Sequence, residues 1–299
     1  MPDHRLPSDT HIGLAHLRVS DLPRALSFYG ERIGFREVRR DGATAILSAT
    51  GSAPAHLVLE ADPGAPPKPP RTTGLYHVAI RLPTRAALAR VVRRLAAGGW
   101  PFQGAADHGV SEAFYLADPD GNGLELYTDR PRDQWAWAGD QVVMVTEALD
   151  VQGLLAEAGD ADDGPIDPGA DIGHVHLSVS DLARAEAFYA ELLGLDVTQR
   201  TYPGALFLAA GGYHHHLGTN TWAGRGAAAP PPDAVGLVAF ELRLPDREAW
   251  AALVERVRAA GHAPQPAPSY GVEDAVLLRD PDGNGVLLSA GADHRGAPA

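Results

Sequence analysis

Histidine and carboxylate side chains recur at strand-like positions in the first half of the chain, and both residue types bind metal ions. His16, His77 and Glu125 each lie in a segment where apolar residues occupy the alternate positions. Because side chains alternate between the two faces of a strand, these three are expected on the face opposite the core. Two imidazoles and one carboxylate form the facial ligand set of non-haem Fe(II) oxygenases. The pattern predicts a metal site made by His16, His77 and Glu125.

Further polar residues share this placement and are of types that move protons or donate hydrogen bonds. His56 and Tyr115 alternate with apolar neighbours, so both are expected on the same open face of their strands. His108 lies in the loop before Tyr115, and Tyr115 precedes Glu125 by ten positions. Chemistry on an ionisable substrate requires a base near the metal. These three residues are therefore candidate catalytic groups.

Composition limits the classes of protein to which the chain could belong. The 299 residues include no cysteine, which excludes disulfides and thiolate metal sites. The formal net charge of -13 argues against a nucleic-acid partner, because phosphate contacts require lysine and arginine. No stretch reaches the roughly 18 consecutive apolar residues of a membrane span or resembles a secretory signal. We expect a cytoplasmic protein with no membrane partner.

The elements that must position these residues are repeated. Residues 13–35 (GLAHLRVSDLPRALSFYGERIGF) return as residues 173–195 (GHVHLSVSDLARAEAFYAELLGL), 160 positions later. The turn DPDGN at 118–122 likewise returns at 280–284. Within each copy a shorter order of strand, helix and several strands occurs twice. In the first module the helix is followed by predicted strands at 43–49 and 55–60. In the second, the patterns predict a strand over 74–82, a helix over 84–97, and strands near 113–117 and 123–128. The chain is therefore predicted to be an α+β protein of four βαβββ modules.

The repeat also suggests where the domains begin and end. We predict an N-terminal, metal-bearing domain over residues 1–132, a helical linker over 133–170, and a C-terminal domain over 171–292 with a degenerate metal site. The helix of the linker is expected over 146–159, with Thr146 as its N-terminal cap. In the second copy, Ala239 and Leu287 stand where His77 and Glu125 stand in the first. A second metal site with that ligand set is not expected.

These motifs resemble those of the vicinal oxygen chelate superfamily, which contains glyoxalases, bleomycin resistance proteins and extradiol dioxygenases. The resemblance rests on H-L-x-V-S-D-L followed by F-Y, and on D-P-D-G-N-x-x-E-L at the end of the next module. The four-module length is most similar to two-domain catechol 2,3-dioxygenases. The resemblance implies that the modules pair into two half-open β-cup domains with helices outside.

The resemblance also implies roles for the candidate residues. It suggests Fe(II), with Mn(II) as the alternative, and His56 as the base that takes the hydroxyl proton. His108 and Tyr115 would donate hydrogen bonds to the substrate. The residues of this chain instead favour a metal in the N-terminal half, whereas most two-domain relatives carry it in the C-terminal half.

The expected function is Fe(II)-dependent extradiol ring cleavage, with a catechol-type molecule and O2 as partners. The sequence leaves open whether the chain also forms a homo-oligomer. The alternatives are a metal-dependent glyoxalase-like isomerase or thiol transferase, and a metal-free protein that sequesters its ligand. The run His214, His215 and His216 is interpreted as a structural or interface feature, with metal or substrate binding as the alternative.

Overall fold

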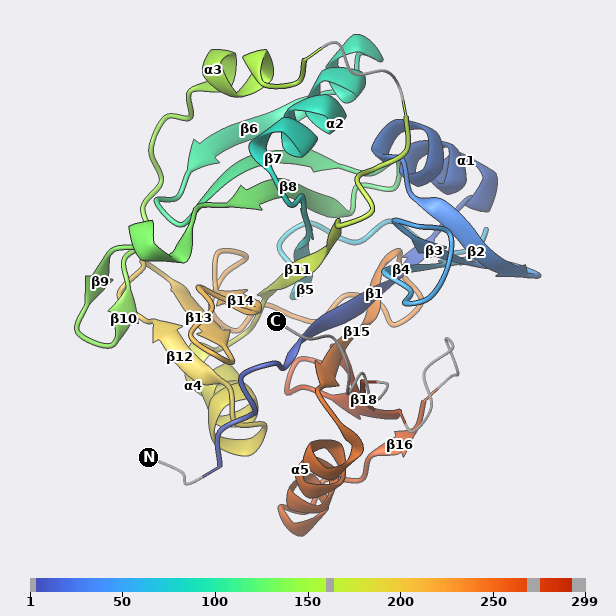
Figure 1. Ribbon diagram of the computed structural model, residues 1–299. Coiled ribbons are helices and arrows are strands. Elements are labelled where there is room, and N and C mark those ends of the chain that lie inside the picture. Colours follow the sequence, from blue (N-terminus) through green and yellow to red (C-terminus); the bar gives the residue numbers. More distant parts are fainter. Residues whose placement is uncertain (1–3, 160–163, 268–274, 292–299) are drawn as a thin grey trace.

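A computed structural model describes residues 4–159, 164–267 and 275–291 and contains two eight-stranded mixed sheets (Figure 1). The first, sheet A, has the strand order β16-β17-β18-β15-β1-β4-β3-β2. Its strands are β16 (Gln265–Pro266), β17 (Val276–Arg279), β18 (Gly285–Ala290), β15 (Gly236–Leu244), β1 (His11–Val19), β4 (Leu57–Ala61), β3 (Thr44–Ser48) and β2 (Arg36–Asp41).

The second, sheet B, has the order β12-β13-β14-β11-β5-β8-β7-β6. Its strands are β12 (Asp196–Gln199), β13 (Ala205–Ala209), β14 (Leu217–Asn220), β11 (Asp171–Ser178), β5 (Gly74–Arg81), β8 (Gly123–Asp129), β7 (Ser111–Ala117) and β6 (Phe102–Asp107). A small hairpin, β9 (Trp137–Ala138) and β10 (Gln141–Val142), forms a separate two-stranded sheet.

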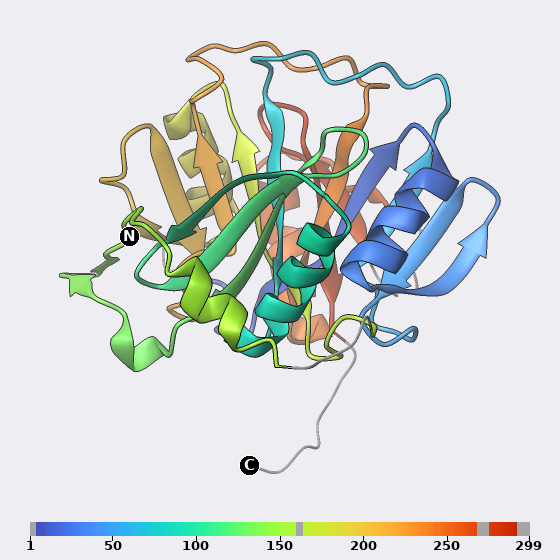
Figure 2. The ribbon, with the colours of Figure 1, turned by 90° about the horizontal axis from the view of Figure 1, so that it is seen from above.

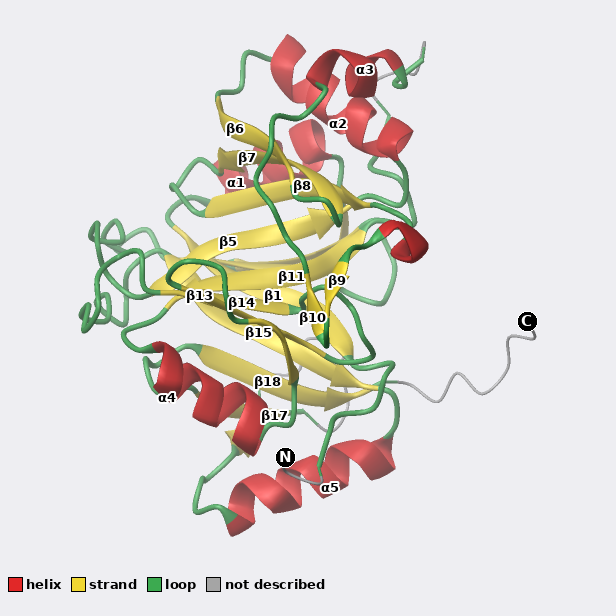
Figure 3. Cartoon of the chain, turned by 90° about the vertical axis from the view of Figure 1, so that its left-hand side faces the viewer, coloured by secondary structure: helices red, strands yellow, loops and turns green. Residues whose placement is uncertain are grey.

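The helices lie outside the sheets, as the fold class predicted (Figure 3). Figures 1 and 3 show α2 and α3 on one side of the molecule and α5 on the opposite side. The helical segments are α1 (Leu22–Leu26), the π-helical η1 (Ser27–Ile33), α2 (Arg85–Ala97), the 3-10 turn η2 (Arg132–Gln134), α3 (Val151–Ala156), α4 (Leu182–Glu186), the π-helical η3 (Ala187–Leu192) and α5 (Arg247–Ala259). None of the helices in the described part of the chain has the length and apolarity needed to cross a bilayer.

Helix α2 begins where the sequence predicts. The Thr84 hydroxyl accepts a hydrogen bond from the Ala87 N–H at 3.1 Å, which satisfies one unpaired donor of the first turn. Leu88 and Leu95 are fully buried against the sheet, as the helical spacing of apolar residues requires. The predicted linker helix is shorter than expected, because α3 is capped by Asp150 and not by Thr146.

The pairing of the modules differs from the predicted domain division. Each sheet combines one module from residues 1–132 with one from residues 171–292: β1 pairs with β15 in sheet A, and β5 pairs with β11 in sheet B. Figure 2 shows strands from both ends of the sequence side by side in the middle of the molecule. Alternation specifies which face of a strand is buried but not which strand lies beside it, so the sequence pattern could not identify these partners.

The repeated DPDGN turns hold together the two modules of each half. Asp118 accepts a hydrogen bond from the hydroxyl of Tyr29 at 3.0 Å, and Asp280 accepts one from Tyr189 at 2.8 Å. All four residues are buried, and each tyrosine lies on the helix of the preceding module. Side-chain contacts therefore join modules within a half, whereas backbone pairing joins the halves.

Candidate metal centre

Three ligand-type side chains converge on sheet B because two of them face the same small residue. His174 on β11 and Glu125 on β8 both lie opposite Ala79 of β5, one on each side of it. His77 lies two residues before Ala79 and therefore on the same face. Since Ala79 has only a methyl group, the longer side chains on either side can meet above it. These three residues, His77, Glu125 and His174, form the ligand cluster.

The geometry of the ligand cluster fits one divalent metal ion. The Glu125 Oε2 lies 3.0 Å from His77 Nε2 and 3.2 Å from His174 Nε2, and the two nitrogens are 3.3 Å apart. Ligands about 2.1 Å from a metal at neighbouring corners of an octahedron are separated by about 3.0 Å. All three side chains are buried, and their ligand atoms point at one another. Three lone-pair atoms converging in this way favour a cation between them.

The electrostatics of the ligand cluster also suit metal binding. Burial lowers the pKa of His174 to about 4, so its imidazole is neutral near pH 7. Burial opposes ionisation of Glu125, but the adjacent His174 and His77 imidazoles hold the pKa of this carboxyl well below its usual value. A carboxylate and a neutral imidazole are the protonation states that bind metals.

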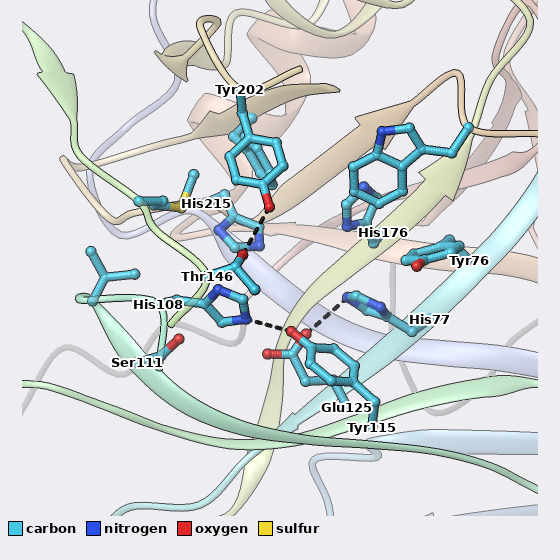
Figure 4. Close-up of a pocket in the computed structure, with 14 residues that line it drawn as sticks. Tyr76, His77, His108, Ser111, Tyr115, Glu125, Thr146, His176, Tyr202 and His215 are labelled. Atoms are coloured by element: carbon cyan, nitrogen blue, oxygen red, sulfur yellow. Dashed lines mark hydrogen bonds and ion pairs between the residues drawn. The ribbon is translucent and has the colours of Figure 1, made fainter. Parts of the chain in front are cut away.

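His108 and Tyr115 lie together beside the ligand cluster (Figure 4). The His108 Nε2 is 2.5 Å from the Tyr115 hydroxyl, and its Nδ1 is 2.7 Å from the carbonyl of Val145. Because a carbonyl can only accept, Nδ1 carries the proton, and in the neutral ring Nε2 accepts from Tyr115. Burial, followed by the Glu125 carboxylate, raises the pKa of Tyr115, which keeps its hydroxyl protonated.

A cavity of about 230 Å³ opens onto these groups. Figure 4 shows the rings of Tyr202, His176 and Tyr76 on one side of it and His108, Tyr115 and Glu125 on the other. The cavity is lined by Tyr76, His77, His108, Val110, Ser111, Tyr115, Glu125, Met144, Thr146, His176, Tyr202, Phe207, His215 and Trp222. The prevalence of rings among the lining residues makes the cavity suitable for a planar aromatic molecule.

Two of the predicted site residues lie in the other sheet. His16 is on β1 of sheet A, where its Nε2 is 3.0 Å from Glu60 Oε2, so its prediction as the third ligand is wrong. His56 precedes β4 of the same sheet, and its Nδ1 accepts a hydrogen bond from the Ala49 N–H at 3.1 Å. It does not line the cavity, so the structure does not support it as the base.

Apolar residues occupy the corresponding place in sheet A. Leu14, Ala239 and Leu287 stand at the repeat positions of His174, His77 and Glu125, and they pack in one buried cluster. These three positions of sheet A therefore carry no side-chain donor atom.

Sequence reasoning missed His174, and it gave substrate binding by His215 only as the alternative to a structural role. His16 has a histidine counterpart in the second copy, His176, whereas the counterpart of His174 in the first copy is Leu14. That difference from Leu14 was the available signal. His176 lies directly opposite His77 on the neighbouring strand and borders the cavity without belonging to the ligand cluster.

The family follows from comparison with known proteins. Residues 10–126 and 171–288 match the glyoxalase/bleomycin resistance protein/dioxygenase superfamily. The chain belongs to this superfamily. Its sequence is 45% identical over 273 residues to the catechol-2,3-dioxygenase of Bacillus subtilis (strain 168), covering 90% of this chain and 95% of the relative.

A second sequence relative agrees with this assignment. Biphenyl-2,3-diol 1,2-dioxygenase 3 of Rhodococcus globerulus is 32% identical over 120 residues, covering 39% of this chain and 63% of the relative. Both sequence relatives are named as dioxygenases, and the chain is classed with the dioxygenases of the superfamily.

Solved structures agree on the fold. A crystal structure from Bacillus subtilis subsp. subtilis str. 168 superposes with a TM-score of 0.67 at 13% identity, covering 96% of this chain and 86% of the other. Glyoxalase I from Zea mays superposes with a TM-score of 0.57 at 19% identity, covering 94% of this chain and 92% of the other.

Proposed function

We propose that this protein is an Fe(II)-dependent extradiol dioxygenase that opens a catechol-type ring beside its two hydroxyl groups. The observation that carries the proposal is the ligand cluster, His77, Glu125 and His174, at the wall of an aromatic cavity. Two histidines and one carboxylate on one face leave the other coordination sites open, as oxygenase chemistry requires. When bound, such an ion supplies the open sites and the electron transfer that let O2 react with the ring.

The size of the cavity is compatible with this substrate class. A cavity of about 150 Å³ accommodates benzene, so 230 Å³ leaves room for a benzene ring with hydroxyl groups and for O2. Tyr76 and Trp222, whose rings lie 5.3 Å apart, are about half exposed and line the same cavity. A flat apolar ring can pack against the exposed part of these side chains on its way in.

The residues around the ligand cluster have roles that follow from their positions. His215 lines the cavity, and its ring centroid lies 4.1 Å from that of His174, so it is the imidazole placed to take a substrate proton. Tyr115 keeps its proton and is oriented by His108, so it can donate a hydrogen bond to a substrate oxygen. Both atoms of O2 would enter the ring-opened semialdehyde acid as the carbon–carbon bond breaks.

The decisive experiment is anaerobic reconstitution with Fe(II), followed by oxygen uptake and product analysis with a panel of catechols. We expect one O2 consumed per ring opened, with cleavage beside the hydroxyl groups. Iron retention without oxygen uptake would contradict the proposal, and turnover of a hemithioacetal with Zn(II) or Ni(II) would favour a glyoxalase-like isomerase.

Two histidine variants sharpen this experiment. His215→Ala should retain iron but lose about 10²- to 10⁴-fold in kcat, the range expected when an acid–base group is removed. His56→Ala is the matched control, because His56 lies in the other sheet. Equal losses in both variants would remove His215 from the proposed mechanism.

A further inference from the structure

The three consecutive histidines before β14 point in different directions. All three are buried, but only His215 lines the cavity. His216 accepts a hydrogen bond from the Ala210 N–H at its Nδ1, at 3.2 Å. His214 faces away from the cavity, and its Nε2 lies 2.9 Å from the Asp129 Oδ1 at the end of β8. The run is therefore neither an alternating strand nor a ready metal site with three ligands.

Asp129 is held as an acceptor. The hydroxyl of Tyr213 donates to its two oxygens at 3.1 and 3.0 Å, and the Arg81 guanidinium donates to Oδ2 at 3.3 Å. Burial opposes ionisation, but the hydrogen bond from His214 and the charge of Arg81 keep the pKa of Asp129 below its ordinary value. A carboxylate has no proton to donate, so the proton in its contact with His214 belongs to the imidazole Nε2.

The contact between His214 and His215 carries the donor–acceptor order set by Asp129 to the cavity. His214 Nδ1 lies 2.7 Å from His215 Nδ1, so one of these two nitrogens must donate and the other accept. His214 is fully buried, and a neutral imidazole avoids the free-energy cost of burying a further cation there. A neutral His214 with its proton on Nε2 accepts at Nδ1. His215 Nδ1 is then the donor, and its Nε2 keeps an unprotonated lone pair.

The internal repeat supports a link between these residues and the ligand cluster. In the other copy, Gly291, Pro54 and Ala55 stand at the positions of Asp129, His214 and His215. All three groups are therefore missing from the sheet that lacks the metal ligands. His56, by contrast, stands at the position of His216 and makes the same contact with a backbone N–H. The histidine that both copies retain is the one with a structural contact.

We propose that Asp129 and His214 are positioning residues that hold His215 in the tautomer with a protonated Nδ1 and a free Nε2 lone pair toward the cavity. This inference rests on the proposed function, because a lone pair directed at the cavity is what a base for a catechol hydroxyl requires. In a catalytic triad a buried carboxylate contacts the catalytic histidine directly and fixes its tautomer. Here a second imidazole, that of His214, lies between the carboxylate and the histidine that faces the cavity. Asp129 and His214 need not touch the substrate themselves.

The test is the tautomer of His215 in the metal-free protein, measured by long-range ¹H–¹⁵N correlation after ¹⁵N-histidine labelling, with assignment by a His215→Gln variant. We expect a protonated Nδ1 and an unprotonated Nε2. A protonated Nε2 in the wild-type protein would overturn the proposal. This result needs neither iron nor turnover, so it can succeed or fail independently of the proposed function.

Asp129→Asn provides the second measurement, since an amide can donate to His214 Nε2 and reverse the polarity of both contacts. We expect His215 to change tautomer, and kcat to fall about 10²- to 10⁴-fold with KM and iron content unchanged. Asp171→Asn is the matched control: it removes the other carboxylate bound to Arg81 but does not contact His214. An unchanged tautomer and kcat in Asp129→Asn would overturn the proposal, and failure of that variant to fold would leave the wild-type spectrum to decide.

Discussion

His174 and Leu14 occupy equivalent positions in the two copies of the repeat, and they differ in their ability to bind a metal ion. We predict that His174→Leu lowers Fe(II) affinity by at least about 100-fold, because it removes a direct ligand. His16→Leu serves as the control and should leave affinity unchanged, since His16 pairs with Glu60 in sheet A. Isothermal titration with Fe(II) under anaerobic conditions measures both. Loss of affinity in His16→Leu alone would place the metal in the other sheet.

His216 allows a prediction about pH. Burial lowers its pKa to about 3, whereas a histidine in the unfolded chain titrates near about 6.5. Between these pH values the unfolded chain binds more protons than the folded chain, so the free energy of unfolding rises with pH. The contribution of His216 to this free energy is fully present above about pH 6.5. His216→Asn keeps an acceptor for the Ala210 N–H but removes the titration.

The slope of unfolding free energy against pH should therefore fall by about 1.4 kcal/mol per pH unit in this variant. Urea unfolding of the metal-free protein at several pH values between about 4 and 6.5 measures that slope. The same slope in wild type and variant would show that His216 is protonated in the folded state.

Much of the candidate site could be read from alternation along single strands. His77, Glu125 and Tyr115 lie on the open face of their strands, as predicted, and the structure brings them together with His108. Alternation could not choose between His174 and His176, because residues two apart share a face. The choice depends on the neighbouring strand: His174 faces the small Ala79, whereas His176 faces His77 itself.

At the scale of elements, the segment that follows β10 contributes to the cavity instead of acting only as a linker. The Val145 N–H donates a hydrogen bond to the backbone carbonyl of His108 at 3.1 Å. The neighbouring side chains of Met144 and Thr146 line the cavity. The Thr146 hydroxyl lies 2.8 Å from that of Tyr202 on the far side (Figure 4). This contact connects the segment between the two halves with the second half.

We predict that Thr146→Val raises KM for a catechol several-fold and leaves kcat within about twofold, because a loosened cavity wall weakens substrate binding without touching the ligand cluster. Steady-state oxygen uptake gives both constants. Thr221→Val is the control, since that hydroxyl contacts Gly204 and does not line the cavity. A fall in kcat with unchanged KM would instead assign Thr146 a role in the reaction.

The elements themselves were largely predictable, but their partners were not. Helix α2 and strands β5 and β8 lie within a residue or two of their predicted ends, because capping and alternation are local signals. The edge strands β2 and β6 were missed, since β2 is almost entirely exposed and β6 shows little alternation between buried and exposed residues. Pairing of β5 with β11 is a long-range event that no local pattern specifies.

At the scale of the whole molecule, the ligand cluster requires both halves of the chain. His77 and Glu125 come from the first half and His174 from the second. We predict that residues 1–159 and 164–299, expressed separately, do not bind Fe(II) with native affinity, and that co-expression restores one metal per complex. Metal analysis after co-purification measures this. Native affinity in residues 1–159 alone would show that the first half completes a site without His174.

The exchange of modules between the halves gives the chain the contacts of a two-fold symmetric pair. His11 lies opposite Arg243 in sheet A, as Asp171 lies opposite Arg81 in sheet B, which is the reciprocal pattern of an isologous interface. A homodimer of one half would build both interfaces from a single sequence and would carry two identical reaction centres, so neither could change alone. A covalent tether removes that constraint. With both protomers fused in one chain, one centre can acquire leucine and alanine while the other keeps its metal ligands. The number of metal ions then falls from two to one per pair of halves, and the symmetric pairing of the strands is kept.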